Sequence, residues 1–122
     1  MRGGNGQVLR LTNRERARHG LRPLRWNRAL ARAARYHAKD MARRNYLAHD
    51  DISGRAWWKR IMRWYRDPAG ENIGRGFGTP EAIVEAWMNS PEHRANILNV
   101  QFRLLGVAYA SDGDYWVQDF GY

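Results

Sequence analysis

The sequence predicts an α+β domain in which helices pack against a small antiparallel sheet. Apolar residues recur at helical spacing over residues 28–44, two Ser/Thr-Pro pairs at Thr79 and Ser90 start further helices, and residues 104–121 alternate like a β-hairpin. With 122 residues, 43% of them hydrophobic, the chain can bury one core but not two. We therefore expect a single domain over residues 11–122 after a flexible lead-in over residues 1–10.

The first helix is expected to be short. Thr12 and Glu15 have the spacing of a capping box, which predicts a helix from Thr12 to His19. His19, next to Gly20, is interpreted as a residue that stabilises the end of this helix. Residues 21–26 are expected to form a loop.

The most regular helix is expected between Asn27, its cap, and Arg44, with Asn45 as a left-handed stop. Its apolar stripe includes His37, which we interpret as a buried histidine satisfied by one hydrogen bond. The opposite, solvent-facing side of this helix is basic and carries Arg28, Arg32, Arg35, Lys39 and Arg43.

Short elements complete the prediction. A helix with a wide aromatic face is expected over residues 56–65, followed by an extended segment at 71–74. Thr79 and Ser90, each followed by proline, start two helices in tandem. Residues 104–110 and 115–121 form the strands of the hairpin, with Asp-Gly in the turn between them.

The net charge of +9 is concentrated in the first third of the chain, where thirteen basic residues face two acidic ones before Asn45. Such a region attracts polyanions such as nucleic acid, an anionic cell-wall polymer or lipid headgroups. The alternative is a solvated helix face without a partner. Because no aromatic interleaving or groove-reading motif accompanies the charge, specific nucleic-acid binding is not expected.

Several classes of site are excluded. The chain has no cysteine, so disulfides, thiolate metal sites and a cysteine nucleophile are ruled out. It contains no phosphate-binding loop, dinucleotide fingerprint or serine-hydrolase motif. No apolar stretch is long enough for a membrane span, and the first six residues lack the apolar core of a signal peptide. We expect a soluble monomer.

Three residues stand out as chemical candidates. His49 lies in a polar loop after the long helix, Glu71 lies between Gly70 and Asn72, and His93 is near the start of the second tandem helix. Taken alone, each signal is weak, since histidines and glutamates are mostly solvated.

The segment Trp87–Leu98, W-M-N-S-P-E-H-R-A-N-I-L, resembles the hallmark of the CAP superfamily (cysteine-rich secretory, antigen 5 and pathogenesis-related 1 proteins), in its bacterial extracytoplasmic branch. The resemblance extends over residues 11–122. It implies the CAP-type α-β-α sandwich, with a small antiparallel sheet between helices, and a secreted or extracytoplasmic location.

The resemblance also implies a cleft lined by histidines and acidic residues. His49, Glu71 and His93 match those positions and are our candidate catalytic residues. His49 and His93 are the candidate metal ligands, and with a carboxylate they form a donor set suited to Zn²⁺. Asn89 stands where many eukaryotic members have a second glutamate. The full set of two histidines and two glutamates found in those members is therefore not expected here.

Three further residues are candidate binding residues. Glu85 is a second candidate for the acidic partner, although in the sequence it precedes Trp87 by two residues, whereas Asn89 follows Trp87 by two. Asn72 and Arg94 are polar residues of the two motifs. Asn72 and Asn96 are interpreted mainly as residues that hold the cleft, whereas Arg94 could also present a cation to an anionic ligand.

The resemblance leaves three functions open. The first is a cell-envelope binding module, with the cleft binding a divalent metal or small polar ligand and the basic helix binding an anionic wall polymer. The second is a hydrolase, including a protease, in which His93 or Glu71 activates water with or without a metal. The third is lipid or sterol binding, for which this short chain lacks the extra segments.

Overall fold

The computed structural model describes residues 3–122. In chain order the elements are α1 (Gly3–Arg18), β1 (Arg25–Trp26), α2 (Arg28–Arg44), α3 (Trp57–Met62), β2 (Pro68–Arg75), α4 (Pro80–Met88), α5 (Pro91–Ile97), β3 (Leu104–Ala110) and β4 (Tyr115–Gly121). In this part of the chain no helix is long and apolar enough to cross a membrane.

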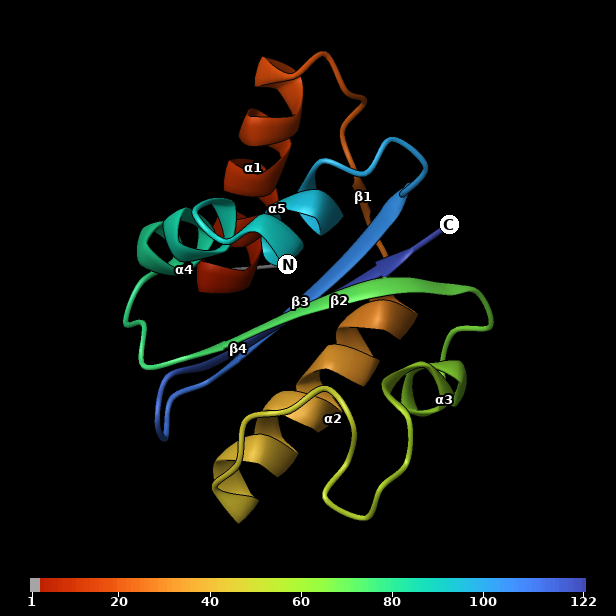
Figure 1. The fold of residues 1–122 in the computed structure, drawn as a ribbon, viewed down its shortest axis with the longest axis vertical. Coiled ribbons are helices and arrows are strands. Elements are labelled where there is room, and N and C mark those ends of the chain that lie inside the picture. The colour runs from red at the N-terminus through yellow and green to blue at the C-terminus, as the bar shows by residue number, and fades with distance from the viewer. Residues whose placement is uncertain (1–2) are drawn as a thin grey trace.

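The sheet lies between two layers of helices. Its strand order is β1-β3-β4-β2, so that β2 forms one edge. Helices α1, α4 and α5 lie on one face, and α2 and α3 lie on the other (Figure 1). The structure confirms the expected α-β-α sandwich.

The sheet is mixed, because residues 25–26 are not loop as expected. Arg25 and Trp26 pair in parallel with Leu104 and Leu105 of β3. The backbone of Arg25 also donates to the carbonyl of Arg103 at 2.9 Å. A two-residue edge strand of this kind has no periodic signal in the sequence, because its pairing comes from a segment almost 80 residues away.

The start of the chain corrects another prediction. The expected flexible lead-in is wrong for residues 3–10, which belong to α1; residues 1–2 lie outside the described residues. Thr12 does not begin the helix but lies within it, fully buried, and accepts a hydrogen bond from Gln118. Val8 and Leu9 are buried in the core, and this tertiary packing stabilises the glycine-rich first turns.

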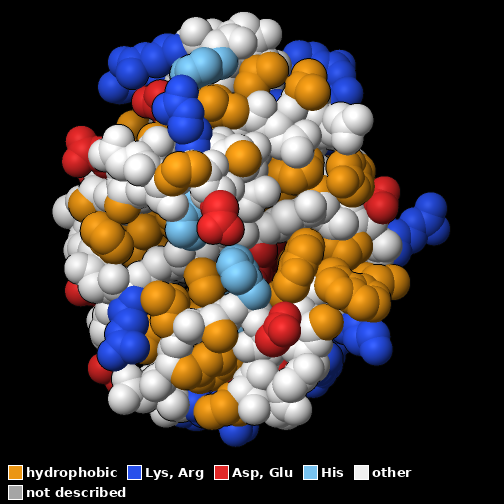
Figure 2. Space-filling model, in the orientation of Figure 1, with side chains coloured by type: hydrophobic (Ala, Val, Ile, Leu, Met, Phe, Trp, Pro, Cys, Tyr) orange, Lys and Arg blue, Asp and Glu red, His pale blue; other side chains and the backbone are white. Residues whose placement is uncertain are grey.

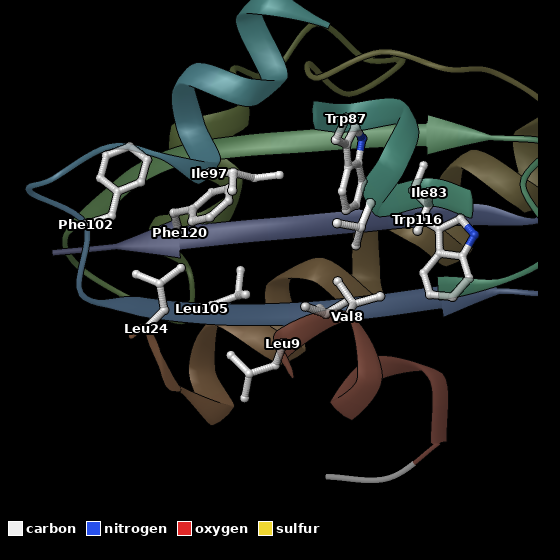
Figure 3. Close-up of a cluster of buried hydrophobic side chains, with 12 residues drawn as sticks. Val8, Leu9, Leu24, Ile83, Trp87, Ile97, Phe102, Leu105, Trp116 and Phe120 are labelled. Atoms are coloured by element: carbon white, nitrogen blue, oxygen red, sulfur yellow. The ribbon is translucent and has the colours of Figure 1, made fainter. Parts of the chain in front are cut away.

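The two larger apolar clusters pack the helices against the two faces of the sheet. The larger one joins α1, α4 and α5 to the sheet and includes the buried rings of Trp87, Trp116 and Phe120 (Figure 3). The second joins α2 to the other face through residues such as Ala34, Met41 and Val117. The sheet is therefore buried on both faces.

The other elements are close to their predicted positions. Asn27 caps α2 by accepting from the backbone of Leu30, and Asn45 ends the helix with φ 56°. Thr79 caps α4 in the same way, and the hairpin strands have the expected bounds. Helix α3 is shorter than expected, and β2 is longer, because β2 pairs with β4 over its length.

Candidate functional site

Strand β2 positions the central carboxylate of the candidate site. In the antiparallel pair of β2 and β4, Glu71 lies opposite Asp119, and Asn72 lies opposite Gln118. Neighbouring side chains of a strand point to opposite faces, so the first pair lies on the α3 side of the sheet and the second on the α5 side. All four residues are buried although they are polar.

Arg60 of α3 binds the Glu71 carboxylate. One guanidinium nitrogen of Arg60, Nη2, lies 2.8 Å from Oε2 and 3.0 Å from Oε1 of Glu71. The same nitrogen donates to the carbonyl of His49 at 3.0 Å. The side chains of Arg60 and Glu71 are 0% and 1% exposed, so this ion pair is shielded from water.

Two more carboxylates surround Arg60. Its Nη1 lies 3.7 Å from Asp119, and its Nε lies 3.5 Å from Asp51. Burial raises the pKa of Asp119 well above its usual value, and the neighbouring Glu71 charge adds to the rise. Burial opposes ionisation of Glu71 too, but the hydrogen bond from His49, the neighbouring Asp119 carboxyl group and the charge of Arg60 lower its pKa to about 2. Glu71 is therefore the ionised member of the pair, and Asp119 retains its proton more readily.

His49 projects from the loop between α2 and α3 and is bonded to this carboxylate. Its Nδ1 lies 2.9 Å from Oε1 of Glu71, and its side chain is 46% exposed. Because Glu71 is ionised, Nδ1 is the donor in this hydrogen bond, which leaves Nε2 directed away from the carboxylate. Asp50 holds the end of the loop by accepting from the backbone of Trp57 at 3.0 Å.

His93 approaches from the other side of β2. It is half-buried on α5, and its Nδ1 lies 2.8 Å from Oγ of Ser90. Burial lowers the pKa of His93, and the nearby His49 lowers it further, against a smaller opposite effect of Glu92. His93 therefore favours its neutral form. Figure 2 shows histidine side chains in the middle of this face beside acidic side chains, with Lys and Arg mainly around the rim.

A network of amides fixes the backbone around the site. Asn72 donates to the carbonyl of His93 and to Gln118, both at 3.1 Å. Asn96 donates to the carbonyl of Glu71 at 3.1 Å and to Asn72 at 2.9 Å. The network thus ties β2 to α5. These contacts agree with the interpretation of Asn72 and Asn96 as residues that hold the cleft.

The structure shows the positions of four further residues to which the sequence assigned a role. Glu85 lines a separate hollow between α1 and α4, with Arg14 and Met88, so the structure does not bring it to His49 and Glu71. Arg94 is exposed and donates to Nε2 of His19 at 3.2 Å. His19 accepts this bond while its Nδ1 lies 2.9 Å from the carbonyl of Glu15, near the end of α1. His37 is fully buried and bonded to the carbonyl of Ala48, as expected.

The expected three-ligand zinc site is not assembled. Residues 3–122 contain no group of three or more His, Cys, Asp or Glu side chains that could hold a metal ion. The carboxylate of Glu71 already binds Arg60 and His49. Two imidazoles alone are an incomplete ligand set for zinc in proteins.

Sequence reasoning missed the residues that control Glu71. The position of Arg60 could have indicated a buried cation. It is a charged residue three positions from Trp57 and four from Trp64, on the same face of the predicted aromatic helix. Gln118 and Asp119 could have indicated a buried polar site, because these two neighbouring polar residues interrupt an otherwise apolar strand.

Comparisons with known proteins agree with this architecture. The profile of the CAP family, described as the cysteine-rich secretory protein family, matches residues 9–120. The uncharacterized Bacillus subtilis protein YkwD is 41% identical over 93% of this chain and 45% of its own length. The uncharacterized membrane protein YlbC of the same organism is 37% identical over 93% of this chain and 33% of its own length.

A solved structure is similar over nearly the whole chain. An extracellular protein containing an SCP domain, from Bacillus anthracis, superposes with a TM-score of 0.91 and 36% identity over 98% of this chain and 40% of its own. The chain thus spans less than half the length of these three relatives. The profile match and these identities over most of the chain show that it belongs to the CAP family, the cysteine-rich secretory protein family, although it contains no cysteine.

Proposed function

We propose that this chain is a cell-envelope binding module that acts outside the membrane and holds a small polar ligand between His49 and His93. The observation that carries the proposal is the state of Glu71. Its two oxygens bind Arg60, one of them also binds His49, and its pKa is about 2. Such a carboxylate orients His49 and does not exchange protons at neutral pH.

The location is supported by the relatives. The similar Bacillus anthracis structure is described as an extracellular protein, and a more distant structural neighbour from Borrelia burgdorferi as an outer surface protein. The first shares 36% identity with this chain.

The chemistry of the ligand follows from the two imidazoles. Nδ1 of His49 donates to Glu71, so in the tautomer with that proton Nε2 is the acceptor. A ligand with a hydroxyl or amide donor fits this atom. Zn²⁺ binding by His49 and His93 stays a prediction, with the remaining positions filled by water or the ligand.

A second candidate function is hydrolysis, and the His49–Glu71 pair favours it. A carboxylate that holds one ring nitrogen of a histidine prepares the other nitrogen to take a proton from water. The base would then be His49, and Glu71 would position it. This differs from the expectation that His93 or Glu71 itself activates water.

The test is an NMR titration of the histidine ring signals with a soluble digest of bacterial cell wall. We expect the rings of His49 and His93 to shift and the ring of His19 to stay unchanged. The double variant His49→Ala, His93→Ala should lose binding, while His19→Ala, an exposed histidine elsewhere, should retain it. Binding that survives in the double variant would contradict the proposal.

Two additional measurements separate the alternatives. Calorimetry with Zn²⁺ on the wild type and the double variant tests the metal prediction directly. Mass spectrometry of the digest tests hydrolysis: fragments that appear with the wild type, but not with His49→Ala, would favour the hydrolase over the binding module.

A further inference from the structure

Helix α2 carries a row of cations without ion-pair partners in the described part of the chain. Arg28, Arg32, Arg35 and Lys39 are all exposed, and none belongs to an ion pair or a side-chain hydrogen bond there. By contrast, Arg44 on the same helix pairs with Asp40 at 2.9 Å. No carboxylate of residues 3–122 therefore pairs with the charges of this row.

These cations form one wall of a groove. Two adjoining hollows of about 500 and 470 Å³ share Lys39 and Tyr109 and run between α2 and β3. The four cations of α2 line the first hollow, and the opposite wall comes from Val107 to Ala110. The sequence alone did not indicate that a concave surface accompanies the charge.

The strand that faces the cations has an open edge. Strand β1 pairs only with Leu104 and Leu105 of β3. Beyond Leu105, the outer edge of β3 has no strand partner among residues 3–122. Backbone polar groups at such an edge bind water or a ligand, and nearby positive charges discourage pairing with another strand.

Two aromatic side chains complete the walls. The ring of Tyr109 lies 4.4 Å from that of Trp116, and its hydroxyl donates to Asp114. Trp26 is half-buried against the core. Both rings are held in place by the protein, so they do not form the series of free stacking surfaces typical of sites for single-stranded nucleic acid.

The spacing of the cations suits a linear anion. The row from Arg28 to Lys39 extends about 16 Å at ~1.5 Å per residue, with neighbouring residues about 4.5–6 Å apart along the helix axis. Three of the four are arginines, whose planar guanidinium groups match phosphate oxygens. Asp112 lines the second hollow, so the most favourable part of the groove is the half nearer Trp26.

From this placement we infer that the groove between α2 and β3 binds a linear polyol phosphate, an anionic phosphodiester polymer, along Arg28, Arg32, Arg35 and Lys39. The inference rests on the proposed function in placing the chain outside the membrane. It uses a different surface from the His49–His93 site, so each can fail without the other.

The experiment measures the anisotropy of a labelled glycerol phosphate oligomer long enough to span the groove. The groove variant is Arg32→Gln, Arg35→Gln, Lys39→Gln. The matched control is Arg14→Gln, Arg22→Gln, Arg66→Gln, which removes the same charge from exposed positions elsewhere. Glutamine preserves helix propensity, so α2 should remain folded.

We expect the groove variant to bind about 30-fold more weakly, and the control to stay within about threefold of the wild type. The slope of log affinity against log salt should fall in magnitude by about 2, since each phosphate contact contributes ~0.7. The His49→Ala, His93→Ala variant should bind the oligomer like the wild type.

Three results would overturn the inference. Equal losses of affinity in the groove variant and the control would show that binding depends on net charge and not on the groove. No binding of the oligomer by the wild type would show that the groove is not a site for this polymer. Tighter, groove-dependent binding of an oligothymidylate with the same number of phosphates would identify nucleic acid as the occupant instead.

Discussion

Two charged regions of this protein use the same residue types in opposite ways. Under the candidate site, Arg60 is buried among the carboxylates of Asp51, Glu71 and Asp119. Along α2, the cations of the groove are exposed and have no carboxylate partner in residues 3–122. Buried charge must be neutralised within the fold, whereas exposed charge remains available to a ligand.

The buried and the exposed charges act on different properties of the protein. The buried region determines the position of His49 through its hydrogen bond to Glu71, so the loss of this region should appear first in stability. The exposed region contributes little to folding, so its loss should appear in binding.

Removal of the buried cation should be the most damaging change. Arg60→Met leaves Glu71 and Asp119 in the interior without their cation, and we expect the free energy of unfolding to fall by about 3–5 kcal/mol. Urea denaturation measures the loss. Arg63→Met is the control, because Arg63 is exposed and lies over the rings of Tyr36 and Trp64; it should cost less than about 1 kcal/mol. Similar losses in both variants would refute this difference between the buried and the exposed charges.

Acid should weaken the fold through Glu71. Its pKa of about 2 in the folded protein lies below the ordinary 4.5, so its contribution is complete above pH 4.5 and is lost as the pH falls through 2. The difference corresponds to about 3 kcal/mol at ~1.36 kcal/mol per pKa unit. Glu71→Gln should therefore show a shallower decline of stability in urea unfolding between about pH 5 and about pH 2. An unchanged acid slope would show that other groups are responsible.

The close packing of α2 on the sheet can be tested at Gly106. A Cβ at this position would overlap the backbone of Leu30 and Ala31, so Gly106→Ala must move α2 away from β3. We expect a loss of about 2–3 kcal/mol in thermal or urea unfolding, together with weaker binding in the groove. Gly78→Ala is the matched control: its Cβ would meet nothing within 4 Å, and its stability should change by less than about 0.5 kcal/mol.

The smallest effect on stability is expected at His49. Its side chain is 46% exposed, and Arg60 still holds Glu71 when the imidazole is absent. His49→Ala should lower the free energy of unfolding by less than about 1 kcal/mol. A larger loss in urea unfolding would show that His49 stabilises the fold in the same way as the buried charges.

Much of the fold followed from local patterns. The caps at Asn27 and Thr79, the left-handed Asn45 and the alternation of the hairpin all predicted elements that the structure contains. These signals depend on residues within a few positions of one another, so periodicity and backbone preference suffice. The start of α1 was missed because Val8 and Leu9 are stabilised by packing against distant elements.

The candidate site could be predicted only in part. His49, Glu71 and His93 were chosen through the family resemblance, and the structure joins His49 to Glu71 by a hydrogen bond with His93 nearby. Arg60 and Asp119 were not chosen. Their roles depend on the register of β2 with β4 and on the packing of α3, which no short motif encodes.

The sequence by itself determined the family, the helices with their caps, the hairpin and the excess of positive charge. Only the tertiary structure decided which arginines act inside the protein. Arg16 is buried and donates to the carbonyls of Ile97 and Asn99, and Arg60 is buried against Glu71, whereas Arg32 and Arg35 remain exposed in the groove. The physical reason is that an arginine is buried only where distant partners satisfy its charge and donors, and folding brings those partners together.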